Sequence, residues 1–285
     1  MVEAISIGTA KNAEAVINRF DHEVKTLNSQ GINFKYRISY KGNITFLGCD
    51  LHDKNISPEK FKLYLAEVLT DIIYEDWASL IVNKIIRDHY YYFSEEEKKS
   101  IKSKVLELIL NEGHKYYPSS RKKQITEKIK EYLDKNDELI LDGFINFRLK
   151  DYMLEIEGLV DDAVDDFLME KEYLEFIRLL RYFVDIQEPK VEEIHILLKK
   201  DAIFQLVDKD GKTIENEYLN GFSVDLMTNS INYDDLLISA LITLAPKEVT
   251  IHTKEQDEFK ETLKTIENIF GERLRYCPGC KICLK

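Results

Sequence analysis

The sequence lacks any apolar run long enough to cross a membrane. The longest apolar stretch, residues 236–245, contains Ser239 and Thr243, whereas a membrane-spanning helix needs about 20 predominantly apolar residues. Residues 1–4 offer neither the basic start nor the following apolar region of a secretion signal. We therefore expect a cytoplasmic protein without a membrane segment.

Proline and glycine are also scarce, with 5 prolines and 11 glycines among 285 residues. Long disordered linkers are rich in these residues, so the composition argues against such linkers. The hydrophobic content of 44% and the charged content of 32% are typical of globular proteins. A chain of this length can bury a sizeable core, and it does not need a metal ion merely to fold.

Positive charge is in deficit, because 40 Lys and Arg residues face 52 Asp and Glu residues and leave a net charge of −12. An acidic chain repels the phosphate backbone, so we expect no nucleic-acid partner. The sequence also lacks a phosphate-binding glycine loop and a nucleophile elbow. No acid–base pair stands at a recognisable spacing. The sequence therefore predicts no catalytic residue, and it leaves open whether the protein is an enzyme.

Cysteine is rare as well, but three of the four cysteines stand close together near the end of the chain. Cys277, Cys280 and Cys283 are each separated by two residues. In a reducing cytosol this spacing favours metal or redox chemistry over a structural disulfide. We predict that the three thiolates bind a metal ion or an iron–sulfur cluster. Redox thiols, and an exposed tail whose thiols have no essential role, are the alternatives.

The three cysteines form an incomplete ligand set for either kind of centre. They match the first three positions of the bacterial ferredoxin run C-x₂-C-x₂-C-x₃-C, whose fourth position would lie beyond Lys285. The segment Cys277-Pro-Gly-Cys280 has the form of a zinc knuckle, but structural zinc takes four ligands. We therefore expect a further ligand from elsewhere in the chain or from another subunit.

Cys49 and His252 are the two candidates for the missing ligand. Each ends a predicted strand, and ligand sites in α/β sheets gather at the carboxyl ends of strands. We expect the strands at 248–252 and 273–276 to be parallel neighbours, which would place His252 beside Cys277. A buried structural thiol at Cys49 and an ordinary surface or capping histidine at position 252 are the alternatives.

The order of strand and helix signals predicts a mixed α+β fold. We expect an N-terminal α/β piece at 1–56, a helical region at 57–189, and a C-terminal α/β piece at 190–285 that carries the cysteines. The first piece includes a hairpin at residues 41–43. From the order of the elements alone, the two α/β pieces could share one sheet, with the helical region as an insertion.

A long amphipathic helix is predicted over residues 137–185, with a break near residues 169–172 as an alternative. Its apolar residues recur close to heptad spacing. They are Leu141, Ile145, Leu149, Tyr152, Ile156 and Leu159. Such an apolar seam could pack against a partner protein or a second copy of the chain. The alternative to a metal-binding protein is therefore a non-catalytic interaction protein whose cysteines are incidental.

Two long segments and the cysteine spacing resemble one known family. Residues 170–189, residues 233–246 with the following 249–252, and the terminal Cys-x-x-Cys-x-x-Cys are similar to the YtxC-like family of sporulation-associated proteins. The resemblance spans the whole chain. It implies a role linked to sporulation in endospore-forming bacteria, and it implies no catalytic residue or cofactor.

Overall fold

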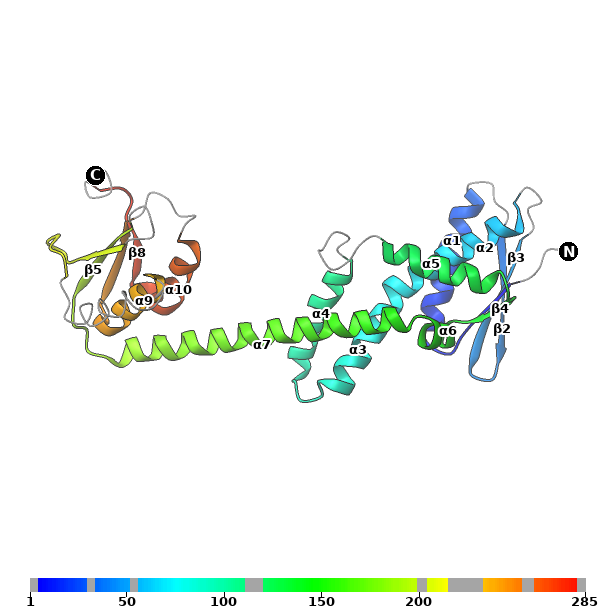
Figure 1. Ribbon diagram of the computed structural model, residues 1–285, viewed down its shortest axis with the longest axis horizontal. Helices are drawn as coiled ribbons and strands as arrows, with labels where there is room; N and C mark the ends of the chain where they lie inside the picture. Colours follow the sequence, from blue (N-terminus) through cyan, green and yellow to red (C-terminus); the bar gives the residue numbers. More distant parts are fainter. Residues whose placement is uncertain are drawn as a thin grey trace. The chain divides into compact units, whose positions relative to one another are not determined.

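A computed structural model describes residues 5–29, 34–51, 56–110, 120–198, 204–214, 233–252 and 259–280 (Figure 1). The described residues form both helices and small sheets, which confirms the predicted α+β class. The chain divides into two compact units, Met1–Phe167 and Leu168–Lys285. Within the described residues, no helix is long and apolar enough to span a bilayer.

The N-terminal unit contains a four-stranded sheet with the strand order β2-β3-β1-β4. Its strands are β1 (Ile5–Thr9), β2 (Phe34–Lys41), β3 (Ile44–Leu51) and β4 (Glu138–Ile140). β2 and β3 form the predicted hairpin, where Gly42 has a φ of 59° that favours glycine. β4 comes from far along the chain and pairs with β1 in parallel.

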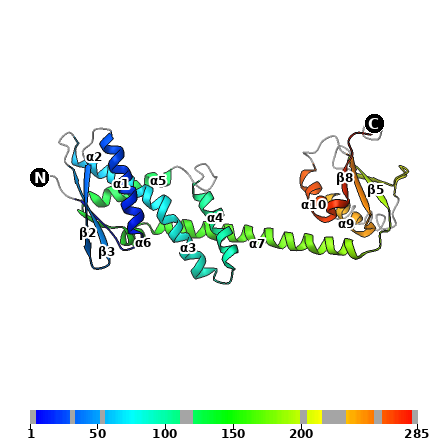
Figure 2. The ribbon, with the colours of Figure 1, turned by 180° about the vertical axis from the view of Figure 1, so that it is seen from behind.

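Helices lie on one side of this sheet, as α1, α3 and α5 show in both views (Figures 1 and 2). The helical elements of this unit are α1 (Ala13–Ser29), α2 (Pro58–Asp71), the π-helical segment η1 (Ile72–Trp77), α3 (Ala78–His89), α4 (Glu95–Leu110), α5 (Ser120–Leu133), α6 (Leu141–Arg148) and the first part of α7 (Lys150–Ile186). The hydroxyl of Ser57 accepts a hydrogen bond from the N–H of Lys60, which caps α2. Ser94 and Glu97 form a reciprocal capping box before α4. These local signals explain where α2 and α4 begin.

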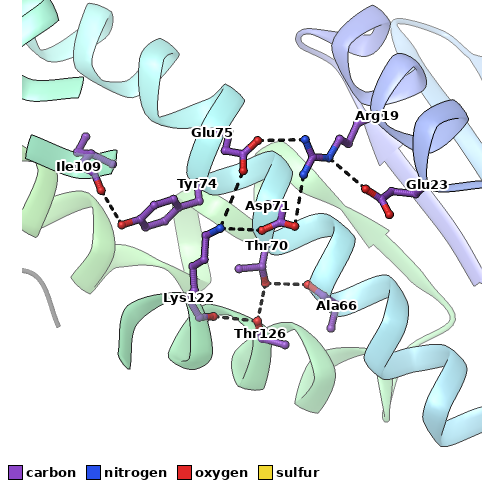
Figure 3. A network of polar contacts seen from close by, with 10 residues as sticks. All are labelled: Arg19, Glu23, Ala66, Thr70, Asp71, Tyr74, Glu75, Ile109, Lys122 and Thr126. Atoms are coloured by element: carbon purple, nitrogen blue, oxygen red, sulfur yellow. Dashed lines mark hydrogen bonds and ion pairs between the residues drawn. The ribbon is translucent and has the colours of Figure 1, made fainter. Parts of the chain in front are cut away.

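A network of ion pairs ties α1, α2, η1 and α5 together (Figure 3). The guanidinium of Arg19 lies 3.4 Å from a carboxylate oxygen of Asp71 and 3.0 Å from one of Glu75. The ammonium group of Lys122 lies 3.0 Å from the other oxygen of Asp71. Two cations thus share the carboxylates of Asp71 and Glu75, and Arg19 also lies 3.6 Å from a third carboxylate, that of Glu23.

The predicted long helix is interrupted in the structure. Residues 138–140 form β4, α6 ends at Arg148, and Leu149 has φ −109° and ψ 35°, outside the helical region. α7 then runs without a break to Ile186. All six residues of the predicted apolar seam are buried. The seam therefore packs within the N-terminal unit.

The C-terminal unit contains a second four-stranded sheet, with the order β6-β5-β7-β8. Its strands are β5 (Glu193–Leu198), β6 (Phe204–Val207), β7 (Glu248–His252) and β8 (Leu274–Tyr276). β7 is parallel to both β5 and β8. The helices α9 (Tyr233–Leu244) and α10 (Lys260–Phe270), followed by the short 3₁₀ turn η3 (Gly271–Arg273), pack apolar side chains against one face of this sheet. By strand alternation, polar residues share the opposite face. They include Glu193, His195, Thr250 and His252.

The strands from the two ends of the chain do not share one sheet, which corrects that expectation. They form two sheets, one in each unit. The unit boundary at Phe167 and Leu168 falls inside the region predicted as a helical insertion. The physical reason is that two apolar cores exist, and Ile177 and Val184 of α7 are buried in the second one, together with α9 and α10.

Candidate metal centre

The C-terminal unit brings His252 and Cys277 to the carboxyl ends of two neighbouring strands. His252 is the last residue of β7, and Cys277 directly follows β8. The backbone N–H of Cys277 donates a hydrogen bond of 2.9 Å to the carbonyl of Ile251, which extends the parallel pairing beyond Tyr276. Both residues therefore lie at one edge of the sheet, where strand order predicted them to meet.

A tight turn then carries Cys280 back to His252. Gly279 has a φ of 112°, a backbone conformation that residues with a side chain rarely adopt. The Sγ atom of Cys280 lies 3.5 Å from Nδ1 of His252. The ligand atoms of His252, Cys277 and Cys280 all lie within 4.8 Å of one another. The three side chains thus form a group that could hold a metal ion.

A histidine and a glutamate from the neighbouring strand β5 hold His252 in place. Nε2 of His252 lies 2.9 Å from Nδ1 of His195, and Nε2 of His195 lies 3.3 Å from a carboxylate oxygen of Glu193. With Nδ1 of His252 facing Cys280, the hydrogen bonds are consistent when Nε2–H of His252 donates to His195 and Nε2–H of His195 donates to Glu193. This arrangement selects the tautomer in which Nδ1 of His252 carries a lone pair for a metal ion.

The surroundings of His252 keep its imidazole neutral. His252 is only 6% exposed. Burial, reinforced by the neighbouring His195, holds the pKa of His252 below its usual range, although the charge of Glu193 acts in the opposite direction. Neutral imidazole is the form of histidine that ligates metals. Cys277 and Cys280 are half-buried, so the site is reachable from solvent on its cysteine side.

His195 and Glu193 were not identified from the sequence. They alternate with the buried Ile194 and Ile196 in β5, and this period-two pattern marks a strand with one polar face. That pattern was a usable signal for the polar face. The parallel register pairs His195 of β5 with Thr250 of β7. His195 is thereby a diagonal neighbour of His252 on the same face, and this placement requires the tertiary structure.

The remaining predicted ligands lie elsewhere or outside the described residues. Cys49 is in β3 of the N-terminal unit, where it is fully buried, and its Sγ lies 3.7 Å from the carbonyl of Leu47. Burial, and to a smaller extent the charge of Asp50, raises the pKa of the Cys49 thiol. Cys283 lies outside the described residues. Across the described segments, the group of possible ligands comprises His252 and two of the predicted cysteines, without Cys49.

Comparison with known proteins supports the resemblance read from the sequence. No solved structure matches the chain. The chain is 29% identical over 143 residues to "Uncharacterized protein YtxC" of Bacillus subtilis (strain 168), and this match covers 48% of the chain and 47% of that protein. The match thus spans about half the length of this curated relative. The sequence model of the YtxC-like family matches residues 63–275, a range that contains His195 and His252 and ends before Cys277. Because this range covers most of the chain, the protein belongs to the YtxC-like family.

Proposed function

We propose that the protein binds a single metal ion through Nδ1 of His252 and the thiolates of Cys277 and Cys280. The observation that carries the proposal is the convergence of these three ligand atoms within 4.8 Å. Sulfur and imidazole donors together favour zinc. Structural zinc takes four ligands, and Cys283 is the fourth ligand that we propose from the cysteine spacing.

The spacing of the ligand atoms supports a single ion over an iron–sulfur cluster. A Zn–S bond of about 2.3 Å and a Zn–N bond of about 2.0 Å, at the tetrahedral angle, place sulfur and nitrogen about 3.5 Å apart. Cys280 Sγ and His252 Nδ1 are separated by 3.5 Å. Thiolates of a cluster bind different iron atoms, and they therefore stand farther apart than ligands of one ion.

Such a centre would fasten the turn after β8 to the end of β7. Gly279 permits the turn, and His195 with Glu193 fixes the histidine ligand, so the metal would order the last residues of the unit against its sheet. We propose no reaction for this centre. The family resemblance supports a role in sporulating cells. Closely spaced cysteines that bind a metal are typical of a reducing compartment, which supports a cytosolic location.

Metal analysis of the anoxically purified full chain tests the proposal. We expect about one equivalent of zinc per chain. We expect this metal to be lost when Cys277, Cys280 and Cys283 are all replaced by Ser, because the thiolates are three of the four proposed ligands. The visible spectrum identifies the centre, since a zinc site is colourless and an iron–sulfur cluster is brown.

The matched control is Cys49→Ala, which removes the remaining cysteine and leaves the terminal group intact. We expect it to retain the metal. Equal metal content in the wild type and the triple variant would overturn the proposal, whereas loss of metal in Cys49→Ala would make Cys49 a ligand. A brown protein would show that the centre is an iron–sulfur cluster and not a zinc ion.

An exposed apolar face on α7 favours a second candidate function, an interaction protein. The residues of this face recur at seven-residue spacing along the part of α7 that belongs to the C-terminal unit. Its residues are Met169, Phe176, Leu179, Phe183 and Ile186, each at least 45% exposed. Two identical helices can pack such exposed faces against each other about a twofold axis. We therefore propose that this face binds a second copy of the chain.

Light scattering on the full chain tests self-association. We expect a dimer, and we expect Phe176→Glu to shift it to monomer, because a carboxylate in an apolar seam is costly to bury. Leu174→Glu is the matched control, since Leu174 is 46% exposed and lies on the opposite side of the helix at about 100° per residue. A wild-type monomer, or equal effects of both changes, would exclude this pairing.

A further inference from the structure

We propose that a cavity in the N-terminal unit binds a phosphate-bearing small molecule. The cavity has a volume of about 650 Å³ and lies between the residues after β1, the helix α3 and the helix α6. This volume is in the range of sites for small organic ligands. The cavity belongs to a different unit from the candidate metal centre, so this inference is independent of the proposed function.

The cavity lies where two parallel strands end. Lys11 and Asn12 follow β1, Asp142 follows β4, and all three line the cavity. β1 and β4 are parallel neighbours, so their carboxyl ends meet at this edge of the sheet. In α/β sheets, ligands bind in the crevice outside the carboxyl ends of parallel strands.

Three cationic side chains line the cavity, in a chain whose net charge is −12. Lys11 comes from the residues after β1, and Lys84 and Arg87 come from successive turns of α3. Arg87 forms an ion pair of 2.9 Å with the adjacent Asp88. For the ammonium groups of Lys11 and Lys84, no carboxylate among the described residues lies within ion-pair distance. An anionic ligand would supply negative charge beside these two ammonium groups.

The carboxylate that lines the cavity is engaged with the backbone. Oδ2 of Asp142 accepts a hydrogen bond of 2.7 Å from the N–H of Ala10 and one of 3.2 Å from the hydroxyl of Thr9. Asp142 therefore holds the residues between β1 and α1 in place. The arrangement contrasts with the network around Arg19 and Lys122, where each cation has carboxylate partners.

An apolar wall completes the cavity. Trp77, Ile81, Ile145 and Met153 line it beside the cations. Trp77 ends η1, and π-helical turns within helices are frequent at functional sites. The wall indicates a ligand with an apolar or aromatic group next to its anionic group. Lysine is a common phosphate binder, and paired lysines with an arginine match the multiple charge of a phosphate ester or polyphosphate.

Fluorescence of Trp77 measures binding directly, because Trp77 is the sole tryptophan of the chain. Full-length protein would be titrated with ATP, pyrophosphate and adenosine in the absence of added metal. We expect a saturable change in tryptophan emission with ATP within about 1 mM, a weaker response to pyrophosphate, and none to adenosine, since the anionic group is required.

Lys84→Glu is the decisive variant, and Lys99→Glu on α4 is its matched control, since both lysines are exposed on helices of the same unit. We expect Lys84→Glu to weaken ATP binding at least about tenfold, because a charge-assisted contact becomes a repulsion, and Lys99→Glu to leave it unchanged. Absence of a saturable response to ATP, a response to adenosine equal to that to ATP, or equal affinities of the two variants would overturn the proposal. Circular dichroism would confirm that both variants keep the fold.

Discussion

Alkylation of Cys49 in the folded protein is expected to be at least about a thousandfold slower than alkylation of Cys277 and Cys280. Cys49 has no exposed surface in β3, between the partner strands β1 and β2. Burial raises the pKa of this thiol, and the charge of Asp50 raises it further, so the reactive thiolate is disfavoured at neutral pH. Cys277 and Cys280 are half-buried and lie beyond the last strand.

Mass spectrometry of peptides from protein alkylated for increasing times measures this difference. A chelator would be present, so that a bound metal does not protect Cys277 and Cys280. Denatured protein is the control, and there the three thiols should react at similar rates, because burial no longer distinguishes them. Similar alkylation rates of the three thiols in the folded protein would show that the sheet around Cys49 opens readily. Such a result would contradict the buried position of Cys49.

Replacing His195 with Ala is expected to weaken metal binding about 10- to 100-fold, the range measured for residues that orient metal ligands. In the tautomer assigned from the hydrogen bonds, Nδ1 of His195 accepts the Nε2–H of His252, and this bond keeps Nδ1 of His252 directed at Cys280. Without this hydrogen bond, the imidazole of His252 can rotate and change tautomer. Part of the free energy of metal binding is then spent on ordering the imidazole. His195→Asn should restore part of the affinity, because its Oδ1 can accept the same hydrogen bond.

Competition with a chromophoric chelator would measure the zinc affinity of each variant. Gln205→Ala is the matched control, since Gln205 lies on the adjacent strand β6 and its amide contacts Thr213 rather than the site. Thermal unfolding of the metal-free proteins separates a positioning role from general destabilisation. An unchanged zinc affinity in His195→Ala, or an equal loss in Gln205→Ala, would contradict a positioning role for His195.

Local features of the fold were predictable because neighbouring residues determine them. The hairpin at Gly42 needs a residue that tolerates positive φ, and the caps at Ser57 and Ser94 need side-chain oxygens at helix starts. The short strand β4 was missed, because three residues that precede a helix carry too little periodicity to distinguish strand from helix. Its partner β1 lies at the other end of the unit, so its pairing is a non-local contact.

The candidate metal centre was partly predictable for the same reason. The two-residue spacing of the cysteines is local, and the rule that ligands gather at strand ends led to His252. That rule proposed Cys49 equally, and only the separation of the strands into two sheets puts Cys49 into a different unit. His195 contacts His252, and Glu193 contacts His195. Both contacts depend on strand register, which the sequence does not contain as a local pattern.

The sequence by itself determined the α+β class, the family, the helix caps and a set of closely spaced thiols, because each depends on residues close together in the chain. The tertiary structure alone decided that two separate cores exist and that His195 and His252 meet. It also decided that Lys11, Lys84 and Arg87 line one cavity. These arrangements depend on which apolar faces pack together and in which register. Many pairings of strands and helices satisfy the same local periodicity, and the burial of apolar surface against a particular partner selects among them.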